Sequence, residues 1–183
     1  MCVAMKKIKL SPSIILIVLP AVSLVLIFAF LISILSGAHE KRVEYCELGI
    51  ILTDDFITYD TEGTFSVAYS DGKTVVGISR YSFVDCEEMG LLTTYTPKKL
   101  ATVYLEMMGR TVDEGVKVRG DIPYFTYTQT AADGSRYFYM PTFYRTPYAY
   151  FVITFITPKE REEAGRVEFY GYMDTVYLLE EYL

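Results

Sequence analysis

Four consecutive residues near the middle of the chain, Ser70-Asp71-Gly72-Lys73, match the S-x-x-K spacing of serine enzymes that recognise penicillins. In those enzymes the serine opens a helix, and the motifs S-D-N and K-T-G complete the site. Neither further motif occurs in this sequence. Alternating apolar residues on both sides of Asp71-Gly72 instead predict a β-hairpin with a type I′ turn. We therefore interpret these four residues as a turn.

Paired carboxylates are the second candidate chemistry, because two carboxyl groups can cleave a glycosidic bond. Adjacent acids occur at Asp54-Asp55, Glu87-Glu88 and Asp113-Glu114. Neighbouring side chains on a strand point to opposite faces, so none of these pairs is ready-made for one substrate. Their turn-like neighbours favour solvated loop acids. A hydrolase that uses carboxylates is kept as an alternative.

Histidine and cysteine chemistry is limited by composition. The single histidine, His39, precedes almost all of the polar part of the chain. A Ser-His-Asp or Cys-His system is therefore not available there, and Cys46 and Cys86 alone do not complete a thiolate zinc site. We predict no catalytic residue, no metal site and no cofactor. The two cysteines could form a disulfide or remain two buried thiols, since spacing along the chain does not set their distance.

Tyrosine supplies the third candidate, a binding surface. All 17 tyrosines follow His39, and seven of them fall between residues 124 and 150. Alternation along strands divides these rings between two faces, one of which must pack on helices. The other face could offer an aromatic platform to a glycan or a peptide. The candidate binding surface consists of Tyr137, Tyr139, Tyr144 and Tyr148.

An uncharged apolar run extends from Ile14 to Leu35, and it determines on which side of a membrane the rest of the chain lies. As a helix it would span about 33 Å, the thickness of a bilayer's hydrocarbon core. Three lysines precede the run and two basic residues follow it closely, which favours a cytoplasmic N-terminus. A cleaved signal peptide is the alternative, but its apolar core usually has about 7–15 residues. We expect an uncleaved anchor that exports the rest of the chain.

These observations divide the chain into four parts: a cytoplasmic tail (1–12), a transmembrane helix (13–36), a linker (37–46) and an extracytoplasmic domain (47–183). All 23 acids and 14 of the 17 basic residues follow the apolar run, so the exported part has a net charge of −9. Such a charge disfavours nucleic acid as a partner. We expect the lipid bilayer to be a partner through the N-terminal helix.

The elements that position the candidate residues follow from periodicity and turn signals. A helix begins after Thr96 and ends before Gly109, with a stripe formed by Leu100, Val103, Tyr104 and Met107. A second helix begins at Pro158, with a stripe of Val167, Tyr170 and Met173, and residues 175–178 leave it in extended form. A loop is expected over 85–94. Strands are expected over 48–53, 65–70, 74–83, 116–119, 122–130, 136–145 and 148–157.

The last three strands form an antiparallel meander, in which Pro141 indicates a bulge or an unpaired edge. The fold class is α+β: a transmembrane helix followed by one domain with a mainly antiparallel sheet of about six or seven strands packed by helices.

The order of these segments resembles a known group of proteins. The segments are GIILTDDF, FSVAYSDGKTVVGISRYSF, the helix after Thr96, IPYFTYTQTAADGSRYFYMPTFYRTPYAYFVITF and a last helix ending DTVYL. Together, over about residues 47–179, they resemble uncharacterised exported or membrane-anchored proteins of Firmicutes-type bacteria with a Mog1/PsbP-like α/β/α domain. The resemblance implies this fold and a place in the bacterial envelope, and no functional residue transfers with it.

The functional expectation is a non-catalytic binding or assembly module at the bacterial cell envelope. Its partner would be an envelope protein or a glycan. A carboxylate-dependent hydrolase and a structural subunit of a membrane complex are the alternatives.

Overall fold

The computed structural model describes residues 40–109 and 115–182. The expected tail and transmembrane helix, over residues 1–36, lie outside the described residues, as does the acid pair Asp113-Glu114. Within the described ranges, no helix is both long and apolar enough to cross a bilayer.

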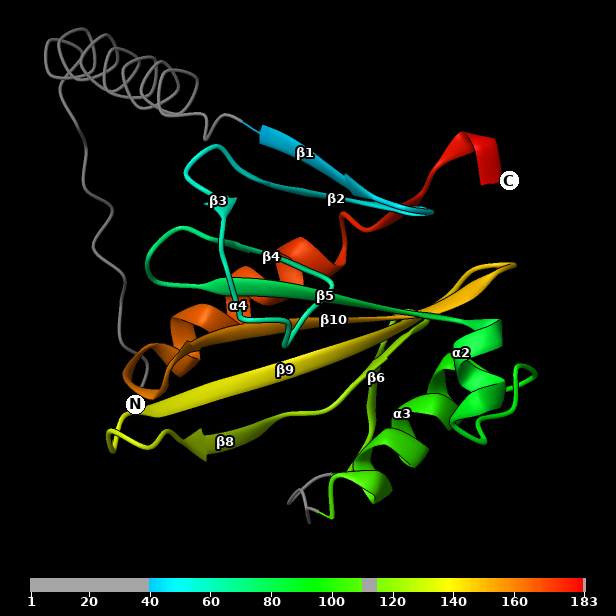
Figure 1. Ribbon diagram of the computed structural model, residues 1–183. Helices are drawn as coiled ribbons and strands as arrows, with labels where there is room; N and C mark the ends of the chain where they lie inside the picture. Colours follow the sequence, from blue (N-terminus) through cyan, green and yellow to red (C-terminus); the bar gives the residue numbers. More distant parts are fainter. Residues whose placement is uncertain (1–39, 110–114, 183) are drawn as a thin grey trace, which may run out of the picture. The chain divides into compact units, whose positions relative to one another are not determined.

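Two antiparallel sheets form the framework (Figure 1). The larger sheet has eight strands in the order β3-β4-β5-β10-β9-β7-β6, and β8 also pairs with β9. Its strands are β3 (Ile57–Thr58), β4 (Val67–Ser70), β5 (Val75–Ser82), β6 (Lys117–Arg119), β7 (Ile122–Tyr124), β8 (Tyr127–Thr130), β9 (Arg136–Arg145) and β10 (Ala149–Pro158). The small sheet has the order β1-β2-β11, with β1 (Glu40–Tyr45), β2 (Leu48–Thr53) and β11 (Tyr177–Leu178).

Helices cover both faces of the larger sheet. The helical segments are α2 (Phe83–Glu88), α3 (Pro97–Met107), η1 (Lys159–Arg161), α4 (Glu162–Met173) and η2 (Glu180–Tyr182). One core joins β10 to the small sheet and α4, and it contains Leu52, Phe155 and Phe169. A second core lies on the α2 and α3 side and contains Leu100 and Phe143. A mixed α/β class with antiparallel strands is therefore confirmed. The expected single sheet of about six or seven strands is wrong, because the strands of the described residues form one sheet of three and one of eight.

The meander at the centre of the larger sheet follows the sequence pattern closely. Strands β9 and β10 pair from Tyr150 opposite Arg145 to Pro158 opposite Tyr137. Thr146 closes their turn, since its backbone nitrogen donates to the carbonyl of Ala149 at 2.9 Å. The segment 122–130, expected as one strand, is instead split into β7 and β8.

The split lies opposite Pro141, where a ladder bond from a backbone nitrogen is not available. On its other side Pro141 lies opposite Thr154 of β10, within the continuous register of the two strands. The proline thus interrupts one ladder of a central strand, which is the kind of irregularity that its position in the sequence indicated.

Residues 40–45, expected in a linker, form the edge strand β1. Val43 is buried and packs in the core, while the alternate side chains of Arg42 and Glu44 are exposed. The Lys41 amine donates to the carbonyl of Phe56 at 2.8 Å. The sequence did not predict this strand, because most of its residues are charged and one buried apolar side chain is a weak signal of alternation.

The expected loop over 85–94 also needs correction, because α2 occupies its first residues. Ser82 caps this helix: its hydroxyl accepts from the backbone nitrogen of Asp85 at 3.1 Å, and the Asp85 carboxylate accepts from that of Ser82 at 3.0 Å. The reciprocal pair is a capping box, which S-x-x-D spacing could have revealed.

Both longer helices bury faces that match the expected stripes only in part. In α3 the start at Thr96 is confirmed, since its hydroxyl accepts from the nitrogen of Lys99 at 3.2 Å. Met107 of the expected stripe is 66% exposed. The apolar contacts come from Leu100, Ala101, Tyr104, Leu105 and Met108.

In α4, Met173 of the expected stripe is fully buried, but Val167 of that stripe is 73% exposed. Phe169, which lies outside the expected stripe, is fully buried in its place. The helix begins at Glu162, after a 3-10 turn that starts at Lys159. Close approach at Gly165 fixes this rotation, because a Cβ there would lie 2.7 Å from Cγ2 of Thr157.

The S-x-x-K residues form a turn, as expected, but not of type I′. Gly72 has a φ of +83°, while Asp71 is not among the residues with positive φ. The Asp71 carboxylate accepts from the backbone nitrogens of Lys73 and Thr74 at 2.8 and 2.6 Å. The Ser70 hydroxyl accepts from the nitrogen of Gly72 at 3.0 Å. Both polar side chains stabilise the turn.

Candidate functional site

The four tyrosines of the candidate binding surface lie in three different places. Tyr137 and Tyr139 share the face of β9 that carries Phe143, on the α3 side of the larger sheet. Tyr144 lies on the opposite face and packs against the core beneath α4. Tyr148 is 56% exposed in the turn between β9 and β10, with its ring 6.1 Å from that of Tyr182.

Tyr139 is joined on its face by Tyr127 of β8. The two rings stack in parallel with centroids 4.9 Å apart and an interplanar angle of 4°. Burial raises the pKa of Tyr144, so its hydroxyl stays protonated. The structure therefore brings two of the four tyrosines together, adds Tyr127 to them, and places Tyr144 in a core.

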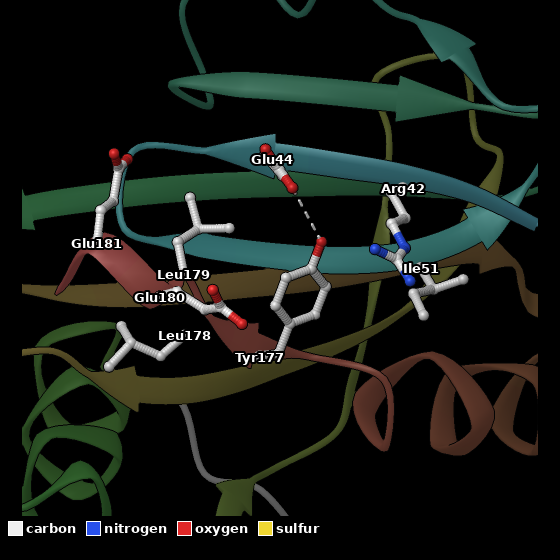
Figure 2. Close-up of a pocket in the computed structure, with 8 residues that line it drawn as sticks. All are labelled: Arg42, Glu44, Ile51, Tyr177, Leu178, Leu179, Glu180 and Glu181. Atoms are coloured by element: carbon white, nitrogen blue, oxygen red, sulfur yellow. Dashed lines mark hydrogen bonds between the residues drawn. The ribbon is translucent and has the colours of Figure 1, made fainter. Parts of the chain in front are cut away.

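A wide hollow lies over the small sheet, at a place that the sequence did not indicate (Figure 2). Its volume is about 940 Å³, and side chains of β1, β2, β11 and η2 line it. The lining residues are Arg42, Glu44, Ile51, Tyr177, Leu178, Leu179, Glu180 and Glu181.

The register of the small sheet explains why these side chains meet. Arg42 pairs with Ile51, Glu44 pairs with Gly49, and Gly49 also pairs with Tyr177. Opposed residues of paired strands share a face, so these residues all lie on the outer face of the small sheet. The intervening residues, Val43, Ile50 and Leu52, are buried against the larger sheet and α4.

Tyr177 lies directly against Gly49. A Cβ at Gly49 would be 2.2 Å from Cζ of the tyrosine ring, so only glycine leaves room for it. The Tyr177 hydroxyl donates to Oε1 of Glu44 at 3.3 Å, a contact that Figure 2 marks with a dashed line. Burial and the neighbouring Glu44 charge raise the pKa of Tyr177, so the hydroxyl remains a donor at neutral pH.

The floor of the hollow is held by the segment that follows α4. The Thr175 hydroxyl accepts from the backbone nitrogen of Ile51 at 3.2 Å. Strand β11 then pairs with β2 through two residue pairs, and the nitrogen of Leu179 donates to the carbonyl of Glu47 at 3.0 Å. The C-terminal segment thus fixes the position of Tyr177 against β2.

The hollow has the chemistry of a polar binding site. Three carboxylates and one guanidinium line it, together with a half-exposed aromatic ring and three aliphatic side chains. Carboxylates accept hydrogen bonds from hydroxyl and amine groups, and Arg42 supplies several donors. Over residues 40–109 and 115–182, no group of three or more His, Cys, Asp or Glu side chains is placed to hold a metal ion.

Two features of the sequence could have pointed to this hollow. Glycine within a strand pattern often marks a close approach of another group, and Gly49 is such a residue. Residues 175–178 were expected to be extended, and β11 confirms this for Tyr177 and Leu178, whereas Thr175 still belongs to the turn after α4. Sequence alone does not say that β11 pairs with β2, because their pairing joins residues far apart in the chain.

The remaining candidate residues are dispersed. Asp54-Asp55 follows β2 in a turn, and Glu87-Glu88 lies exposed at the end of α2. Cys46 is exposed in the turn between β1 and β2, whereas Cys86 is buried between α2 and the larger sheet. Both are free thiols in the structure, so the disulfide considered from the sequence is not formed there.

Comparisons with known proteins give fold-level neighbours only. No family model and no curated protein matches the sequence. A crystal structure from Bacteroides thetaiotaomicron matches with 14% identity and a TM-score of 0.46, over 73% of this chain and 46% of that one. The solution structure of a cyanobacterial PsbP protein (CyanoP) from Synechocystis matches with 10% identity and a TM-score of 0.43. The match covers 78% of this chain and 94% of that one.

This chain spans less than half the length of the Bacteroides chain. A PsbP-like protein is among the structural neighbours. At TM-scores below 0.5, neither neighbour assigns a function or a family to this chain.

Proposed function

We propose that this chain is a non-catalytic binding module, anchored by its N-terminal helix and displayed on the outer side of a bacterial membrane. Its ligand would be a glycan of the cell envelope that lies in the hollow over the small sheet. The observation that carries the proposal is the Tyr177 ring, held against Gly49 and hydrogen-bonded to Glu44 within an open, polar hollow.

The arrangement suits a sugar better than an apolar ligand. A sugar ring presents an apolar face that can stack on an aromatic ring, and its hydroxyls pair with carboxylates and guanidinium groups. Tyr177 would supply the stacking surface, while Glu44 and Arg42 would supply the hydrogen bonds. The negative lining also disfavours strongly anionic ligands.

The proposed location rests on the sequence. The apolar run of residues 14–35 is long enough for a transmembrane helix, and β1 begins only a few residues after it. Tethering near the membrane would raise the local concentration of the module at the envelope, so weak binding could be sufficient.

The carboxylate-dependent hydrolase is the second candidate, since Glu44, Glu180 and Glu181 line one hollow. A glycosidase would use two such carboxylates on opposite sides of the scissile bond. The two functions make different predictions for a Glu44→Gln variant.

The test pairs two assays on the full-length chain with soluble peptidoglycan fragments as the probe. One assay measures retention of the fragments and the other measures release of reducing ends. Saturable retention without turnover supports the binding module. Turnover that Glu44→Gln or Glu180→Gln abolishes, with thermal unfolding unchanged, would identify a hydrolase and overturn the proposal.

A further inference from the structure

Among the described strands, β1 is the longest one at an edge of either sheet. It has six residues, whereas the other strands that end a sheet, β3, β6 and β11, have two, three and two. Figure 1 shows β1 as the outermost strand of the small sheet. An edge strand presents a row of backbone donors and acceptors, with which another strand can pair.

The contacts of β2 show which backbone groups of β1 face this edge. The Thr175 hydroxyl accepts from the backbone nitrogen of Ile51 at 3.2 Å and lies 3.1 Å from its carbonyl oxygen. Both groups of Ile51 therefore point away from β1, where Arg42 is the residue opposite. Because the pairing of an antiparallel ladder alternates, the backbone groups of Arg42 and Glu44 point to the open edge.

A second copy of the chain can meet this edge by two-fold symmetry, which most homodimers have. The two β1 strands would then pair antiparallel about an axis perpendicular to the sheet. Such an axis keeps the outer faces of the two small sheets on the same side. Residues of the outer face, Glu40, Arg42 and Glu44, must therefore pair with residues of the outer face.

The charges of β1 select one register. With Val43 on the axis, Arg42 of each copy lies opposite Glu44 of the other, which gives two pairs of opposite charge. With Arg42 on the axis, two arginines meet, and each Glu40 meets a Glu44. With Glu44 or Lys41 on the axis, that residue meets its own copy. Like charges directly opposite each other destabilise a strand pair, so the register centred on Val43 is favoured.

The other charges of the strand agree with this register. Two arginines and two glutamates alternate in sign around the axis, and their like charges lie only on the longer diagonals. Glu40 comes opposite Cys46, which adds no like charge. The amine of Lys41 is directed to the inner side, where it donates to the carbonyl of Phe56 at 2.8 Å.

We propose that this chain forms a two-fold dimer in which the β1 strands of two copies pair with Val43 on the axis. The small sheets then form one sheet of six strands in the order β11-β2-β1-β1-β2-β11. Arg42 and Glu44 also line the hollow over the small sheet, so each copy contributes both residues where the two hollows meet. The dimer does not depend on the glycan that we propose for the hollow.

Disulfide crosslinking tests the register. Two differently tagged forms of the full-length chain, both with Cys2→Ser and Cys46→Ser, are co-expressed and oxidised; the remaining native thiol, Cys86, is buried. Arg42→Cys in one form and Glu44→Cys in the other should give a linked pair that carries both tags. Their Cα atoms would be about 5.5 Å apart, which suits a disulfide.

Two combinations are the controls for this crosslink. Arg42→Cys in both forms places the thiols on a diagonal of about 7–8 Å, so the yield of linked pairs should be about 10-fold lower or less. Arg42→Cys with Asp133→Cys, an exposed residue in the turn between β8 and β9, should give none. An Arg42→Cys form that links to itself as well as to Glu44→Cys would overturn the register.

Charge reversal tests the same contact without a crosslink. Sedimentation equilibrium of the full-length chain in a density-matched detergent should show a reversible dimer. Arg42→Glu places like charges opposite each other twice and should weaken the dimer about 10-fold or more. Adding Glu44→Arg to that variant restores opposite charges and should restore the dimer. Arg136→Glu, at an exposed arginine of β9, is the matched control.

Arg42 and Glu44 are both exposed, so these variants are expected to fold, and thermal unfolding checks this. A dimer that Arg42→Glu leaves unchanged would lie at another surface and overturn the proposal. A chain that stays monomeric at about 100 μM, with no link between Arg42→Cys and Glu44→Cys, would also overturn it. These measurements report association alone, so they fail or succeed separately from binding of peptidoglycan fragments.

Discussion

Glu47 and Arg80 form a two-point ion pair that joins the small sheet to the larger one. Nε of Arg80 lies 2.8 Å from Oε2 of Glu47, and Nη2 lies 2.5 Å from Oε1. Glu47 is in the turn between β1 and β2, and its side chain is only 4% exposed. Arg80 is on β5. The hydrogen bond from Arg80 lowers the pKa of Glu47 below its ordinary value.

Loss of Arg80 should therefore destabilise the domain. Arg80→Ala leaves the Glu47 carboxylate buried without its partner, which we expect to cost about 2–4 kcal/mol in chemical denaturation. The pair of Arg119 with Asp174 is exposed on both sides, so Arg119→Ala is the control and should cost about 1 kcal/mol or less. Equal losses for the two variants would mean that Glu47 is not held by Arg80.

The same pair predicts a dependence of stability on pH. Because the folded pKa of Glu47 is lowered, its contribution is present above the unfolded value of 4.5 and is lost as the pH falls through the folded pKa. The free energy of unfolding, measured between about pH 7 and pH 3, should fall more for the unmodified chain than for Glu47→Gln. Parallel pH profiles of the two proteins would contradict this origin of acid sensitivity.

Gly49 should be replaceable only if Tyr177 is also changed. A methyl group at position 49 meets the tyrosine ring, so Gly49→Ala should cost about 1–3 kcal/mol. In the double variant with Tyr177→Ala, much of the Gly49→Ala cost should vanish, giving a coupling free energy of about 1 kcal/mol or more. Gly171→Ala, on the open side of α4, is the control and should be neutral or stabilising. If the free-energy costs of Gly49→Ala and Tyr177→Ala simply added in the double variant, the contact between the two residues would not be the cause of the Gly49→Ala cost.

The two free thiols allow a test of topology. An impermeant maleimide should label Cys46 on intact cells without unfolding, because this thiol is exposed. Cys86 should react only after unfolding, since it is buried and burial raises the pKa of its thiol. Cys2 should react only after the membrane is permeabilised. Single-cysteine variants separate the three signals, and labelling of Cys2 alone on intact cells would reverse the proposed orientation.

Local signals in the sequence were enough to place most elements. The proline and threonine that start α3, the Asp-Gly turns and the apolar, β-branched and aromatic runs of β9 and β10 each act within a few residues. Apart from α2, whose local capping box was not recognised, predictions failed where tertiary packing decides. Val167 of α4 turns outward because Gly165 brings the helix close to Thr157, a contact that periodicity does not encode.

The candidate site was harder to predict for the same reason. Tyr144 and Tyr137 look alike in the sequence, yet alternation places them on opposite faces of β9 and α4 covers only one of these faces. Tyr177 and Glu44 are 133 residues apart, and they meet only because β11 pairs with β2 beside β1. Contacts of this kind follow from sheet order, which local patterns leave open.

Titration of soluble peptidoglycan fragments into the full-length chain and its Tyr177→Ala variant is the most direct measurement of the central claim. Tyr59→Ala, which removes a tyrosine that is 50% exposed outside the hollow, is the matched control. The account predicts that calorimetry detects saturable binding that Tyr177→Ala weakens about 10-fold or more and Tyr59→Ala leaves unchanged. Binding that is equally strong in all three folded proteins, or absent from the unmodified chain, would contradict it.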